Sequence, residues 1–144
     1  MRNVLKRYSI YVLSVFLLSA CGGDMDDRQA VEVAKGYVVK NQLQKAYLEL
    51  KNALQVNPGN AEARYLLGQV NLAIGDSDFA AKEFRKAEKA GWDEGESKLG
   101  LARAWVAGHQ FQKLLDELEI KDSYADIIRA DLYGLKAYSE AVLG

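Results

Sequence analysis

The sequence is poor in the residues that build covalent and metal-based sites. Its 144 residues include one cysteine, one proline and one histidine. A single cysteine excludes an intramolecular disulfide framework, and one cysteine with one histidine excludes a Cys/His zinc site. A catalytic triad would have to use the one histidine, His109. The acidic pairs at 93–94 and 116–117 are adjacent in sequence, so their side chains point to different faces of a helix and do not form an acid–base pair. We therefore expect no enzymatic activity, no metal and no cofactor.

The chain also lacks a strong net charge. It has 19 Lys and Arg residues against 20 Asp and Glu residues, a formal net charge of −1. Without a basic field, nucleic acid is not an expected partner, and nothing in the sequence indicates a small-molecule substrate. A composition of 49% hydrophobic and 27% charged residues is usual for a globular chain, and this length allows one domain.

A short apolar run near the N-terminus predicts an export signal. Residues 10–18 are almost all apolar and follow the basic residues Arg2, Lys6 and Arg7. At about 1.5 Å per residue, this run covers roughly half of a ~30 Å hydrocarbon core, which is too short for a membrane-spanning helix. We therefore predict a cleaved signal peptide over residues 1–20.

The end of this segment, Leu18-Ser19-Ala20-Cys21, resembles the lipobox of bacterial lipoproteins. The resemblance implies that Cys21 is lipidated and becomes the new N-terminus, followed by a short tether that ends at residue 26. Gly22, and not an aspartate, follows the cysteine, which implies an outer-membrane location facing the periplasm. An unmodified thiol after an ordinary secretory signal is the alternative.

From residue 27 onward, apolar residues recur at helical spacing and predict an all-α fold. Small residues recur with a period of 34, at Ala34, Ala46 and Ala53 and again at Gly68, Ala80 and Ala87. Small residues at these positions allow two antiparallel helices to approach, and larger side chains such as Phe84 fill the space beside them. The pattern resembles tetratricopeptide repeats, which implies helical hairpins stacked as a short right-handed solenoid.

This period divides the chain into repeat units. We expect units at 27–60 and 61–94, a degenerate third unit at 95–128, and the first helix of an incomplete fourth unit at 129–144. Residues 123–126 resemble a capping box for the last helix. Four apolar residues of that helix are expected to face a following repeat: Leu132, Leu135, Tyr138 and Val142.

A narrower resemblance concerns the lipobox, the tether and the runs at 50–54, 60–68 and 110–118. Together they resemble the N-terminal part of the tetratricopeptide-repeat lipoproteins of exosortase/PEP-CTERM systems. The resemblance implies a role beside exopolysaccharide production and surface-protein sorting. Those proteins carry many more repeats, which leaves open that this chain is an N-terminal fragment. A pilus-assembly, secretion or outer-membrane-assembly lipoprotein with the same fold is the alternative.

The first helices of a repeat solenoid line its concave face. At the inward positions we expect Lys35, Tyr65, Gln69 and Arg103 to contact a protein partner, although a solvated face without a ligand is the alternative. Position 5 of the first unit is Val31, which departs from the pattern that clamps a C-terminal carboxylate. The sequence therefore predicts a non-catalytic, lipid-anchored scaffold for protein–protein interaction in the bacterial envelope.

Other residues are expected to be structural. Trp105 is predicted to lie in the core, Trp92 to shield the junction between the second and third units, and His109 to lie in a solvated turn. The second helices are expected to expose their charged residues to solvent, and in the second unit these are Lys82, Glu83, Lys86 and Lys89.

Overall fold

The computed structural model describes residues 26–144. The predicted signal peptide, Cys21 and all but the last residue of the tether lie outside the described residues. Within residues 26–144 the chain forms seven α-helices and no strand, which confirms the all-α prediction. The helices are α2 (Asp27–Val39), α3 (Leu43–Val56), α4 (Ala61–Ala73), α5 (Ser77–Lys89), α6 (Glu94–Ala107), α7 (Phe111–Glu117) and α8 (Asp126–Leu143).

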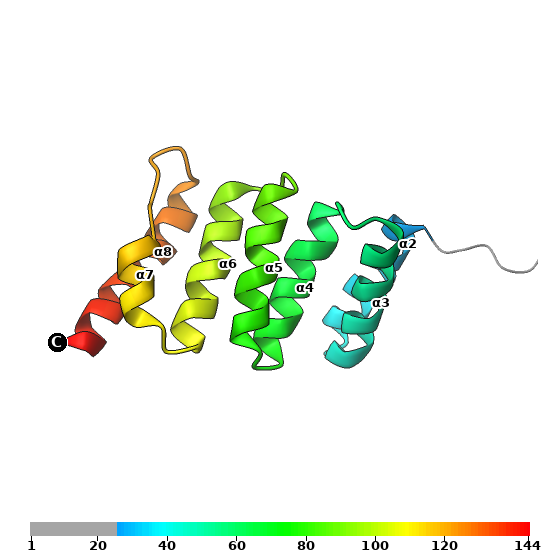
Figure 1. Ribbon diagram of the computed structural model, residues 1–144, viewed down its shortest axis with the longest axis horizontal. Coiled ribbons are helices and arrows are strands. Elements are labelled where there is room, and N and C mark those ends of the chain that lie inside the picture. The colour runs from blue at the N-terminus through cyan, green and yellow to red at the C-terminus, as the bar shows by residue number, and fades with distance from the viewer. Residues whose placement is uncertain (1–25) are drawn as a thin grey trace, which may run out of the picture.

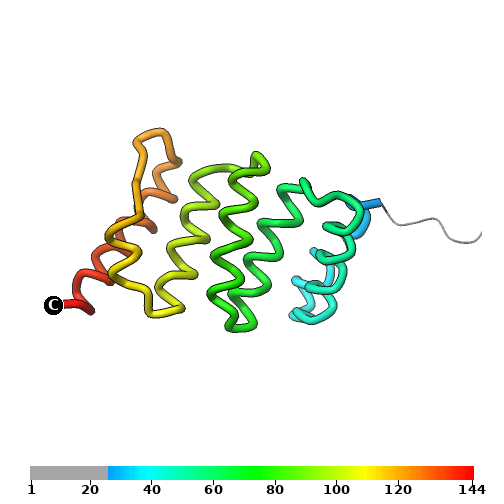
Figure 2. Tube along the Cα trace, viewed as in Figure 1, coloured from blue at the N-terminus to red at the C-terminus, as the bar shows by residue number. Residues whose placement is uncertain are grey.

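The helices pack as successive hairpins. α2 packs against α3, α4 against α5 and α6 against α7, and the C-terminal helix α8 packs on both α6 and α7 (Figure 1). Each of the first helices α2, α4, α6 and α8 packs against the next one, whereas the backbones of the described second helices α3, α5 and α7 do not approach one another, and α5 meets α7 through the side chains of Arg85 and Glu117. The array is therefore curved, with the first helices on its concave side, and the chain path from one end to the other can be followed in Figure 2.

The hairpin turns repeat with the same period as the small residues. Asn41, Gly75 and His109 each adopt a positive φ, of 54°, 90° and 55°, and they lie 34 residues apart. In each turn the next residue donates its backbone N–H to a carbonyl five residues earlier, as Asp76 does to Asn71. Glycine and asparagine are the usual residues in this left-handed conformation, and histidine is also enriched there. His109 is exposed and lies in the turn after α6, as predicted.

The small residues of the repeat are buried between helices. Ala34, Ala46, Ala53, Ala80 and Ala87 are fully inaccessible, which confirms that they are packing residues. Trp105 is also buried, as predicted.

The phenylalanine of α5 fills the space between two first helices. A Cβ atom at Gly68 in α4 would lie 2.8 Å from the Phe84 ring, and one at Gly100 in α6 would lie 2.5 Å from it. The ring is thus held between two glycines on neighbouring helices. The first of these belongs to the repeat pattern, but the role of Gly100 was not predicted.

The third hairpin ends differently from the first two. α7 has only seven residues, and residues 118–125 form a loop that brings Tyr124 against Gly95 at the start of α6. α8 then begins at Asp126, with Ala125 as its N-cap and no side-chain capping hydrogen bond. The predicted capping box at 123–126 is therefore wrong. α8 also begins three residues before the predicted boundary at 129, and the division into units stays a prediction.

The C-terminal helix packs its aliphatic residues inward. Leu132 is fully buried and Leu135 is half-buried in the cluster that includes α6 and α7, because both lie on the side of α8 that faces those helices. The prediction that these two residues face a following repeat is wrong. Tyr138 and Val142 are exposed, and Tyr138 makes an edge contact with Phe111 of α7.

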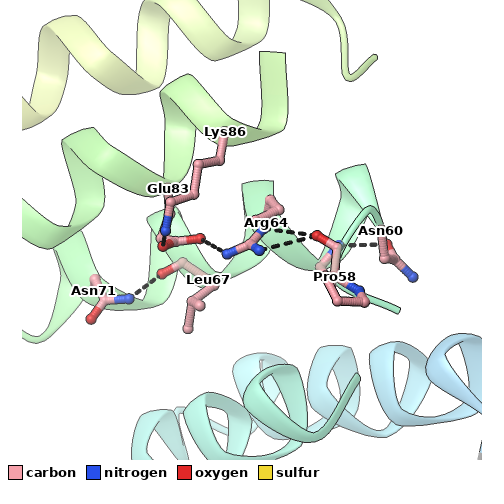
Figure 3. Close-up of polar contacts among 8 residues, drawn as sticks. Pro58, Asn60, Arg64, Leu67, Asn71, Glu83 and Lys86 are labelled. Atoms are coloured by element: carbon pink, nitrogen blue, oxygen red, sulfur yellow. Dashed lines mark hydrogen bonds and ion pairs between the residues drawn. The ribbon is translucent and has the colours of Figure 1, made fainter. Parts of the chain in front are cut away.

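One charged residue expected on the outer surface is buried. Glu83 of α5 is 1% exposed, whereas Lys82, Lys86 and Lys89 are exposed as predicted. Its carboxylate lies 2.8 Å from Nη1 of Arg64 and 2.6 Å from Nζ of Lys86 (Figure 3). Arg64 in turn donates to the carbonyl of Pro58, so the cluster joins α5 to α4 and to the loop before it.

Candidate functional site on the concave face

Three of the four predicted contact residues meet at one hollow. Tyr65 and Gln69 of α4 and Arg103 of α6 line a cavity of about 270 Å³ on the concave face. The rest of the lining is apolar or small and comes from α4, α5 and α6, with Leu72, Ala73, Phe84 and Gly100. The hollow exists because glycine and alanine occupy positions where larger side chains would fill it.

Tyr65 is held in place by two aromatic neighbours. Its ring stacks on Trp92 at 4.9 Å with an interplanar angle of 19°, and it meets Phe84 edge-on at 5.6 Å. Burial raises the pKa of the Tyr65 hydroxyl, and the negative charge of Glu96 adds to this shift. Trp92 donates its ring N–H to Glu96 at 2.8 Å, so it covers the contact between α4 and α6 as predicted.

Lys35 does not reach the hollow. It forms ion pairs with Glu32 of its own helix, at 2.7 Å, and with Glu62 of α4. The hydrogen bonds to Glu32 and Glu62 raise the pKa of Lys35, because both stabilise its charged form. The lysine therefore links α2 to α4, and its positive charge is compensated within the chain.

Arg103 lies between two hollows. On its α8 side a second cavity, of about 300 Å³, is lined by Arg103, Ala130, Asp131, Gly134 and Leu135. Nη2 of Arg103 donates to Oδ2 of Asp131 at 2.8 Å, and both side chains are about half-exposed. This contact connects α6 to α8, and Asp131 was not identified from the sequence.

Not every inward position offers surface to a partner. Val31 and Leu99 occupy the same inward position as Tyr65 in their units, but both are buried in the core clusters. Among the residues that line the hollow, Gln69, Ala73 and Arg103 are exposed.

A third hollow, of about 310 Å³, lies beside the start of α6 and has an acidic lining. Its carboxylate Glu94 accepts hydrogen bonds from Lys121 and from the hydroxyl of Tyr124. The lysine lowers the pKa of Glu94, and burial together with Glu94 raises the pKa of Tyr124. Both groups are held by structural contacts, so the hollow does not present an acid and a base to a substrate.

The comparisons with known proteins agree with this architecture. Residues 40–93 match the tetratricopeptide repeat family. This segment is therefore similar to tetratricopeptide repeats, and the fold is one of tetratricopeptide-like helical hairpins. The matched segment runs from the turn of the first hairpin to the loop before α6 and includes α3, α4 and α5 whole.

One similar protein comes from Haemophilus influenzae and is named as a cytochrome c-type biogenesis protein, CcmH. It is 29% identical to this chain over 98 residues, which is 68% of this chain and 21% of the relative. The chain thus spans about a fifth of the length of that relative. Among residues 26–144, no helix combines the length and the hydropathy needed to cross a membrane.

Proposed function

We propose that the protein is a non-catalytic scaffold of the bacterial envelope that binds a protein partner on its concave face. Tetratricopeptide repeats are interaction modules, and the curved array places an apolar hollow beside Gln69 and Arg103. This hollow is the observation that carries the proposal, because it combines apolar surface with a few polar groups at its edge. Lys35 contributes by fixing α2 on α4.

The proposed location is the outer membrane facing the periplasm, with Cys21 as the lipid anchor. This part of the proposal rests on the lipobox and on Gly22 after it. A multiply acylated cysteine would hold the protein stably on a bilayer. The expected result is that Cys21→Ala is no longer processed and lipidated, as measured by metabolic palmitate labelling and membrane fractionation. A mature, membrane-bound Cys21→Ala protein would contradict the anchor.

Two roles are candidates for this scaffold. The resemblance of this chain to the N-terminal part of exosortase/PEP-CTERM lipoproteins supports a role in exopolysaccharide production and protein sorting. The similarity to CcmH of Haemophilus influenzae supports a second candidate, assembly of c-type cytochromes. Pilus-assembly, secretion and outer-membrane-assembly complexes would use the same surface.

A matched pair of variants tests the binding surface. Ala73 and Ala90 are both exposed alanines at helix ends, but only Ala73 lines the hollow. Ala73→Trp should fill the hollow and abolish partner capture in a crosslinked envelope extract, while Ala90→Trp should capture as much as the wild type. Circular dichroism checks that both variants fold. Capture of the same proteins by both variants would refute the concave face, and the captured proteins themselves separate the two candidate roles.

A further inference from the structure

The guanidinium of Arg103 keeps most of its hydrogen-bonding capacity. Arginine carries five N–H donors in a planar fork. Within residues 26–144 only one Arg103 donor has an acceptor, the single 2.8 Å bond from Nη2 to Asp131. The remaining donors lie at the edge of the concave face, between the two hollows that Arg103 lines. A carboxylate that approached along this face could therefore be bound by two parallel hydrogen bonds.

The ion pair between Arg103 and Asp131 is weak enough for a ligand carboxylate to replace Asp131. Both side chains of the pair are about half-exposed, and exposed ion pairs contribute little to stability because water solvates the separated charges well. Asp131 has no second basic partner among the described residues. An incoming carboxylate would thus exchange one weak ion pair for a two-bond contact.

The neighbouring hollow accepts an apolar side chain. The ring of Phe84 lines this hollow, and it packs closely against Gly68 and Gly100. Leu72 and Tyr65 form the walls, and a volume of about 270 Å³ accommodates one large aliphatic or aromatic side chain. An apolar hollow thus lies beside a guanidinium that has free hydrogen-bond donors.

We propose that the partner is a peptide segment that carries a large apolar side chain close to a carboxylate. The apolar side chain occupies the hollow over Phe84, and the carboxylate binds Arg103 in place of Asp131. The inference rests on the proposed function, since it specifies the chemistry of the partner at the same surface. The carboxylate is an Asp or Glu side chain of the partner, because Val31 departs from the pattern that clamps a C-terminal carboxylate.

The probe is a phage-displayed library of random decapeptides, selected against the wild-type protein. We expect selected peptides to contain an acidic residue within about three positions of a large apolar one. The strongest binder is then synthesised with a free or an amidated C-terminus, and with its acidic side chain replaced by the matching amide. We expect the side-chain amide to weaken binding and C-terminal amidation to leave it unchanged; loss on amidation alone would overturn the assignment of the carboxylate. Titration calorimetry measures each affinity.

Protein variants test the exchange. Arg103→Gln should weaken the peptide at least about tenfold, since a charged hydrogen bond is lost. Asp131→Asn should tighten binding severalfold, because the internal competitor is removed. Glu117→Gln is the matched control: Glu117 forms a similarly exposed ion pair with Arg85, and neither residue lines the hollows, so binding should be unchanged.

The outcomes separate this inference from the proposed function. Peptides without acidic enrichment, or an Asp131→Asn variant that binds no tighter than the wild type, would overturn the inference. If Ala73→Trp still abolishes binding of those peptides, the concave face stands as the binding surface. If the peptides bind Ala73→Trp as well as the wild type, or if no peptide is enriched, both proposals fail.

Discussion

The contact between Phe84 and two glycines allows a sharp test of the packing. Gly100→Ala adds one methyl group, whose carbon would lie 2.5, 2.6 and 2.8 Å from three atoms of the Phe84 ring. These distances are far below van der Waals contact, so the ring or the helix must move. Gly68 of α4 also lies close to the ring, because a Cβ added there would be 2.8 Å from it.

We expect the added methyl group to destabilise the protein. Overpacking a filled core costs about 1–3 kcal/mol, and it opposes the gain of about 0.5–1 kcal/mol that Gly→Ala gives in a helix interior. Gly134→Ala in α8 is the matched control, because no atom lies within 4 Å of its added Cβ. The same chemical change should therefore stabilise at residue 134 and destabilise at residue 100.

Urea unfolding followed by circular dichroism measures both free energies. A double variant, Gly100→Ala with Phe84→Leu, should lose less stability than the two single changes predict together, since the smaller side chain relieves the clash. The reasoning is refuted if Gly100→Ala is as stable as Gly134→Ala, or if the two changes at 84 and 100 are additive.

Three further predictions concern the array. Arg64→Met should cost about 2–4 kcal/mol because it leaves a buried carboxylate with one partner, whereas Lys86→Met at the exposed side should cost less than about 1 kcal/mol; equal losses in urea unfolding would contradict this. Ala80→Leu should overpack the α4–α5 hairpin by about 1–3 kcal/mol, and an unchanged melting temperature would argue against the repeat register. Hydrogen bonds from Asn60 and Asn57 lower the pKa of Asp27, so the stability that its ionised carboxylate contributes is present above pH 3.8 and is lost as the pH falls through the lowered pKa. The difference in unfolding free energy between the wild type and Asp27→Asn should therefore shrink in acid, and a difference that does not change with pH would refute the assignment.

Much of the fold follows from local patterns in the sequence. Helical periodicity and a 34-residue spacing of small residues predict the hairpins, because a small residue is needed wherever two helix backbones approach closely. Ala46 and Ala80 are therefore buried as expected. The repeat register also places Tyr65, Gln69 and Arg103 on the first helices, and these three residues line one hollow; their contact with a partner stays a prediction.

The register does not show how far each inward side chain is already engaged. Lys35 is paired with Glu62 of the next hairpin, and Tyr65 is stacked on Trp92. The first contact joins two repeat units, and the second joins α4 to the loop before α6. A position in the repeat therefore predicts which way a side chain points, but it does not predict whether that side chain remains available to a partner.

The sequence by itself determined the helices, the hairpins and the positions of the small residues, because these depend on periodicity along one chain segment. Only the tertiary structure decided that Glu83 is buried, that Gly100 packs against the Phe84 ring and that Asp131 accepts one hydrogen bond from Arg103. Each of these contacts joins different helices, and Arg103 and Asp131 lie 28 residues apart. Their energy depends on the distance and the solvent exposure that packing creates, and neither quantity is encoded in local spacing.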